Sequence, residues 1–209
     1  DESLKKDREI VLAAVKQDGR AFEYADESIK KDREFVMAAV KETGQALDYA
    51  DVSLKKDKEI VMAAVKQDGP HLYYADESLK KDMEFVLAAV KEDGQALDGA
   101  DKSLQKNREI VLEAVKQNGN ALRYADESLK KDKEIVMAAV KQEGSFLKFA
   151  SEELQNDPEL KEIAFYEGHL PDWYEDAEVE DKVEWADEWE PENDGVNINW
   201  LAGDVERDV

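Results

Sequence analysis

The side chains best suited to acid–base chemistry are glutamates and lysines that recur along the chain, together with two histidines. Glutamate returns every 25 residues, seven times from Glu9 to Glu159. Acid–base catalysis needs one special pair of groups, so seven equal glutamates favour charge placement at helix ends instead. His71 and His169 have no second histidine at metal-ligand spacing. The sequence therefore predicts no catalytic residue and a protein that is not an enzyme.

Motifs that would hold a metal ion or a cofactor are also missing from the sequence. The stretch EPENDG at residues 190–195 resembles the start of a calcium loop, but the twelfth position, which needs a bidentate glutamate, is Leu201. There is no glycine-rich phosphate loop and no G-x-S-x-G. The absence of cysteine excludes Cys-ligated zinc and iron–sulfur sites. We expect no cofactor and no metal.

The charge balance narrows the class of partner. The chain carries 52 Asp and Glu against 29 Lys and Arg, a formal net charge of −23. Nucleic acids and anionic membrane surfaces attract clustered Lys and Arg, so this balance argues against both. No apolar run approaches the roughly 20 residues that span a bilayer. The expected partner is another protein, and a place at the periphery of a membrane complex stays open.

A repeat of 25 residues organises most of the chain. The sequence KKDREIVLAAVKQDG at residues 5–19 returns as KKDREFVMAAVKETG at residues 30–44. Six full copies fill residues 1–150, and a partial seventh copy begins at Ser151 and degrades after about Phe165. We number the copies as repeats 1 to 7, and the positions within each copy from 1 to 25.

Positions 7 to 19 carry the start and stop signals of a helix. Position 7 is Asp or Asn in every repeat, and these side chains cap a helix by accepting bonds from its first free amides. Glutamate at position 9 favours the positive end of the helix dipole. Lysine at position 16 and glycine at position 19 are typical of a helix stop. The pattern predicts a first helix over positions 8–18.

A second helix is predicted to follow the glycine. Ala21, Phe22, Ala25 and Ile29 form one apolar stripe at helical spacing. This helix would run from position 20 to position 6 of the next copy, so each repeat would be a helical hairpin. No strand pattern occurs before residue 195. The expected fold class is all-α: an α-solenoid of 25-residue helical hairpins, six full and one partial, with an acidic C-terminal extension.

The repeats must stack, because one hairpin cannot bury its own apolar face. Position 13 is alanine in five full copies but Glu113 in the fifth, so it must reach solvent. Position 14 is alanine in all six full copies, which predicts a close contact between helices there. No capping sequence precedes the first repeat, and we expect its apolar face to be covered by further repeats or by a neighbour.

The recurring pattern ADESLKKDxEIVxAAVKQxG followed by ALxYA resembles the repeats of domain of unknown function 4116, over about residues 1–165. That family occurs in tandem in algae, other protists and some bacteria. The resemblance implies an all-helical array with no established activity and no assigned catalytic residues. Gly99 departs from the pattern where other copies have an aromatic residue, and His71 and Tyr73 depart from it in repeat 3.

Composition changes at residue 168, which divides the chain into a predicted repeat domain (1–167) and an acidic extension (168–209). The extension holds 15 acidic and two basic residues, a net charge of −13, and all four tryptophans of the chain. Tryptophan is enriched among residues that anchor protein interfaces. The extension could instead pack onto the last repeat as a cap. The candidate partner-binding residues are Trp173, Trp185, Trp189 and Trp200.

The sequence favours a non-catalytic protein–protein interaction scaffold, a peripheral subunit of a larger assembly. The alternative is an anionic regulator whose acidic tail occupies a basic site on a partner. The occurrence of the resembled family suggests an algal or protist organelle complex, in the lumen or stroma. Residues alone name neither the compartment nor the partner.

Overall fold

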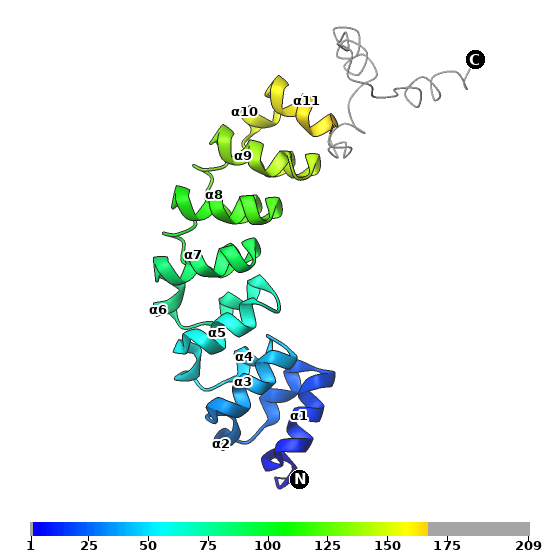
Figure 1. Ribbon diagram of the computed structural model, residues 1–209, viewed down its shortest axis with the longest axis vertical. Helices are drawn as coiled ribbons and strands as arrows, with labels where there is room; N and C mark the ends of the chain where they lie inside the picture. The colour runs from blue at the N-terminus through cyan, green and yellow to red at the C-terminus, as the bar shows by residue number, and fades with distance from the viewer. Residues whose placement is uncertain (1, 167–209) are drawn as a thin grey trace, which may run out of the picture. The chain divides into compact units, whose positions relative to one another are not determined.

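The computed structural model describes residues 2–166, and all regular structure in that range is helical (Figure 1). The predicted all-α repeat array is confirmed. Each repeat contains one long helix, and the long helices of successive repeats pack against one another. They are α1 (Arg8–Gln17), α3 (Arg33–Glu42), α5 (Lys58–Val65), α7 (Met83–Glu92), α8 (Arg108–Gln117), α9 (Lys133–Val140) and α11 (Pro158–Tyr166).

The rest of each repeat is broken into two short pieces, so the predicted continuous second helix is wrong. The first piece covers positions 19–24 and is a 3-10 helix in most repeats: η2 (Gly19–Tyr24), η4 (Gly69–Tyr74), η5 (Gly94–Gly99), η6 (Gly119–Tyr124) and η7 (Gly144–Phe149), with α4 (Ala46–Tyr49) in repeat 2. The second piece is a single turn at the start of the next repeat: η1 (Leu4–Lys6), α2 (Glu27–Lys30), η3 (Leu54–Lys56), α6 (Glu77–Lys80) and α10 (Glu152–Gln155).

The break lies at positions 25 and 1, where one local bond and one bond to the preceding repeat hold the backbone extended. Ala25 and Asp26 are extended, with ψ of 152° and 146°. The Asp26 carboxylate accepts a bond from the Ser28 amide at 3.0 Å, and the Asp26 amide donates to the Lys5 carbonyl at 2.9 Å. Both bonds need an extended backbone, so they stop a helix there. Equivalent bonds to the preceding repeat join Asp51 to Lys30, Asp76 to Lys55, Asp101 to Lys80, Asp126 to Gln105 and Ser151 to Lys130.

The long helices begin as predicted but end for a different reason. The Asp7 carboxylate accepts bonds from the amides of Glu9 and Ile10 at 3.0 and 3.2 Å, which confirms the predicted cap. At the other end Asp18 is extended (φ −150°, ψ 115°), and Gly19 begins the next segment without a left-handed φ. Glycine at position 19 allows close stacking instead.

Gly94 shows this close approach most clearly. A Cβ atom at Gly94 would lie 2.3 Å from the carbonyl oxygen of Ala114 in the next repeat. Such a distance is far inside van der Waals contact, so any larger residue would push two repeats apart.

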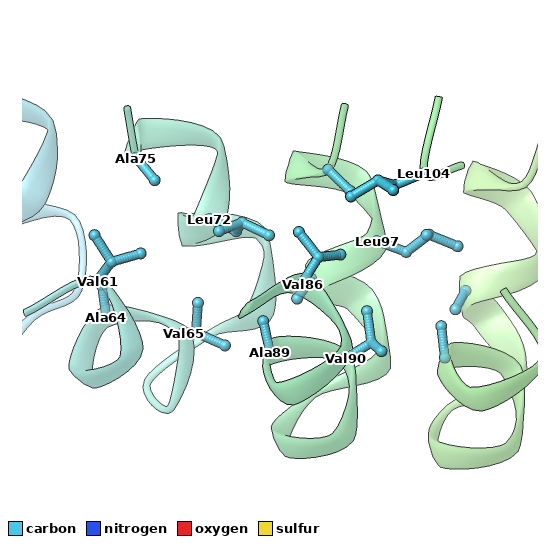
Figure 2. Packing of buried hydrophobic residues seen from close by; sticks show 14 of the residues in the cluster. Val61, Ala64, Val65, Leu72, Ala75, Val86, Ala89, Val90, Leu97 and Leu104 are labelled. Atoms are coloured by element: carbon cyan, nitrogen blue, oxygen red, sulfur yellow. The ribbon is translucent and has the colours of Figure 1, made fainter. Parts of the chain in front are cut away.

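The core is a continuous apolar layer between successive repeats. Figure 2 shows its middle part, where Val61, Ala64 and Val65 of α5 lie on one side of Leu72, and Val86 and Val90 of α7 lie on the other. Position 14 is fully buried in five repeats, which confirms it as a close contact between helices. These alanines are Ala39, Ala64, Ala89, Ala114 and Ala139.

Repeat 1 lacks this cover on its outer side. Ala14 is exposed, and Ile10 is 44% exposed although its counterpart Ile60 is fully buried. Leu4 is 48% exposed. Among residues 2–166 no other repeat packs on this side, so the expected apolar face of the first repeat is present.

Two further predictions concern membrane-spanning segments and the domain boundary. No helix between residues 2 and 166 is both long and apolar enough to cross a membrane. The predicted division after residue 167 falls outside the described residues and stays a prediction.

Candidate interaction surfaces

A shallow groove of about 470 Å³ lies on the outer face of α3, α5 and α7. Its floor is apolar, with Met37 and Met62 at position 12, Ala63 at position 13 and Phe85 at position 10. Lys41 and Lys66 border it near the helix C-termini, and Lys58 and Glu59 border it near the N-terminus of α5. The groove therefore offers apolar contact with charged groups on both sides.

Sequence reasoning placed position 13 at the surface but did not recognise the groove. The half-buried Glu113 and Ala63 confirm that position 13 reaches solvent. Position 12 lies beside it and is leucine in three full repeats and methionine in the other three, half-buried in each. The choice of leucine or methionine at position 12, next to a position that admits glutamate, was the sequence signal that could have revealed the groove. Methionine is unbranched and adaptable, so it suits a surface that binds other chains.

The charges around the groove differ in how well they are compensated. Lys58 Nζ lies 2.7 Å from the Asp82 carboxylate, and this contact raises the pKa of Lys58 and lowers the pKa of Asp82. Lys66 Nζ lies 3.7 Å from Glu92. Lys41 has no such partner among the described residues, because position 17 of the next repeat is Gln67, whereas Lys16 and Lys66 meet Glu42 and Glu92 at that position.

A ladder of ion pairs joins successive repeats along the N-terminal ends of the long helices. The basic residue at position 8 of one repeat contacts the capping aspartate at position 7 of the next. Arg33 reaches Asp57 at 2.7 Å and Glu59 as well, and it lowers the pKa of Asp57. The other rungs join Arg8 to Asp32, Lys58 to Asp82, Arg108 to Asp132 and Lys133 to Asp157.

One rung of this ladder is neutral on both sides. Position 8 of repeat 4 is Met83, and position 7 of repeat 5 is Asn107. Asn107 still caps α8, accepting bonds from the amides of Glu109 and Ile110 at 3.0 and 3.2 Å. The base and the acid are absent together, which indicates that the ion pair and the cap are separate requirements.

The histidines and carboxylates are the possible metal ligands within residues 2–166. No group of three or more His, Cys, Asp or Glu side chains there could hold a metal ion. His71 lies half-buried in η4, stacked on Tyr74 with ring centroids 5.9 Å apart. His169 and the four tryptophans proposed as partner-binding residues (Trp173, Trp185, Trp189 and Trp200) lie outside the described residues.

Comparison with known proteins identifies the repeat. The model of the family described as domain of unknown function (DUF4116) matches residues 7–55, 32–80, 57–105, 107–155 and 132–165. The chain belongs to this family. Searches of curated proteins and of solved structures found no significant match.

Each DUF4116 match begins at position 7, the capping residue of a long helix, and the first four span nearly two 25-residue periods. The family unit is therefore a pair of adjacent long helices with the segments between them. The match at residues 32–80 contains every lining residue of the groove except Phe85. The family description assigns no activity.

Proposed function

We propose that the chain is a non-catalytic protein-interaction scaffold that forms part of a larger assembly. The groove across α3, α5 and α7 carries this proposal, because it places apolar side chains at the surface and borders them with lysines. Exposed apolar surface with a charged border is typical of a site that docks another protein.

The distribution of chemical groups supports a scaffold over an enzyme. Most of the carboxylates with shifted pKa values cap helices or turns, or pair with a lysine or arginine of the preceding repeat. Each such arrangement recurs several times, whereas a catalytic site needs one arrangement that differs from the rest.

Affinity capture with surface variants tests the scaffold. Ala63→Glu places a carboxylate in the groove, at a position where repeat 5 already carries Glu113 without loss of the fold. Ala138→Glu is the matched control, since it makes the same change at position 13 of repeat 6. The proposal expects proteins from the source lysate to be captured by the wild-type chain and by Ala138→Glu, but lost with Ala63→Glu. Equal capture by all three would reject the groove as the docking surface.

The anionic regulator remains the second candidate, because residues 168–209 combine a net charge of −13 with four tryptophans. In that case a chain ending at residue 167 would lose its partners, and raising the salt concentration would release them from the full chain. Partner binding that survives both changes would exclude this candidate.

A further inference from the structure

We infer that the groove binds an amphipathic α-helix of a partner protein, with apolar residues seven positions apart and carboxylates on the flank that meets Lys41. This inference rests on the proposed scaffold function and names the occupant of its docking surface.

The apolar floor selects a helix over an extended peptide. Met37, Met62, Ala63 and Phe85 offer no hydrogen bonds, and the backbone of the long helices beneath them is already paired within each helix. An extended peptide would bring its amides and carbonyls to this floor without partners, which is costly. A helix satisfies its own backbone and presents only side chains.

The spacing of the repeats sets the spacing of the anchors. Packed helices lie about 8–10 Å apart, and position 12 recurs once per repeat. Seven residues of an α-helix rise about 10 Å, so anchors at i and i+7 would meet Met37 of α3 and Met62 of α5, and an anchor at i+14 would lie over Phe85 of α7. A peptide of about 21 residues is long enough to carry all three anchors.

The groove has a limited extent along the stack. On α8 the band of small and apolar side chains is interrupted by Glu113 at position 13. A helix lying across the long helices would therefore contact repeats 2 to 4 and end before repeat 5.

Charge fixes which flank of the bound helix is acidic. Lys58 is compensated by Asp82 at 2.7 Å, and Glu59 is compensated by Arg33. Lys41 lines the groove with no carboxylate partner among the described residues. A carboxylate on the partner helix would complete this pair, as Glu42 does for Lys16 at 3.1 Å between repeats 1 and 2.

Two synthetic peptides and one charge reversal test the inference. Both peptides carry leucine at every seventh position over about 21 residues; one has glutamates on a flank of the leucine stripe, and the other has lysines there. Fluorescence anisotropy would measure their binding to the full chain. We expect the acidic peptide to bind more tightly, Lys41→Glu to weaken it roughly tenfold and to favour the basic peptide, and Lys141→Glu to change neither.

The results separate this inference from the proposed function. If neither peptide binds, or if both bind alike and Lys41→Glu alters neither, the helical acidic occupant is wrong. If Ala63→Glu nevertheless abolishes capture of natural partners, the scaffold function is supported and only the acidic helical occupant is rejected. If Ala63→Glu leaves both peptide binding and capture unchanged, the groove is not a docking surface and both proposals fail.

Discussion

At the scale of single residues, the aspartate at position 7 has two roles, as a helix cap and as an ion-pair partner, and the sequence predicts only the cap. Asp132 accepts bonds from the amides of Glu134 and Ile135 at 3.0 and 3.4 Å, and so caps α9. It also receives the Arg108 guanidinium of the preceding repeat at 2.7 Å. The neutral Asn107 shows that the cap can be kept without the ion pair.

We therefore predict that Asp132→Ala destabilises the protein by about 1–2 kcal/mol, because it removes the cap. Asp132→Asn should cost much less, since the amide oxygen still caps and an exposed ion pair contributes little. Urea unfolding followed by circular dichroism would measure both. Equal losses for the two variants would show that the ion pair matters more than the cap.

Acid should weaken the stack through the same carboxylates. The Arg33 and Arg108 side chains lower the pKa values of Asp57 and Asp132, and Lys58 and Lys133 do the same for Asp82 and Asp157. A carboxylate whose pKa is lowered by folding adds stability that is present above its unfolded pKa of about 3.9 and is lost as the pH falls through the lower folded value.

Unfolding free energy should therefore change little between pH 7 and pH 5 and decrease progressively below about pH 4. Urea titrations at a series of pH values would measure this. A free energy that rises steadily from pH 5 to pH 2.5 would mean that relief of the acidic net charge outweighs the loss of these pairs.

At the scale of elements, the same residue has different consequences according to what packs on it. Ala64 is fully buried between α3 and α5, whereas Ala14 occupies the same position of repeat 1 and is exposed. The sequences around them are nearly identical, so the difference comes entirely from the presence of a preceding repeat.

Ala64→Leu should destabilise the protein by about 1–3 kcal/mol, because the larger side chain overpacks a closed interface. Ala14→Leu should be close to neutral. Thermal unfolding of both variants would check the prediction. A comparable loss for Ala14→Leu would mean that the outer face of repeat 1 is covered, for instance by another chain.

The long helices could be predicted from the sequence because their signals are local: their starts were placed to the residue, and their ends within one to three residues. A capping aspartate and an apolar period act within one helix, as at Asp7 and Val11. The second helix could not, since its break at Ala25 and Asp26 depends on a bond to the Lys5 carbonyl of the preceding repeat. The glycine at position 19 was placed correctly, but its role depends on the distance between repeats.

The groove escaped sequence reasoning for a related reason. Met37 and Met62 are half-buried. How much of each side chain is covered depends on the distance between adjacent long helices. A sequence shows which residues share a helix face, but not how far apart two faces lie. The lack of a carboxylate partner for Lys41 was also not predicted, because it depends on Gln67 in the next repeat. The candidate tryptophans lie outside the described residues.

At the scale of the whole repeat array, stability is a sum of terms between neighbours. Each internal repeat is covered on two sides, and its position 10 side chain is almost fully buried, as for Ile60 and Ile110. Repeat 1 has a neighbour on one side only, with Ile10 at 44% and Leu4 at 48% exposure. In such arrays local opening is easiest where a neighbour is missing.

Hydrogen exchange should therefore be uneven along the stack. We predict that amides of α1 exchange at least about tenfold faster than amides of α5 and α8, since α1 can open without breaking two interfaces. Mass spectrometry of peptides from each helix would measure this, with α5 and α8 as internal controls of near-identical sequence. Uniform protection from α1 to α8 would contradict a sum of neighbour terms, and would show either that the array opens as one unit or that the outer face of repeat 1 is covered in solution.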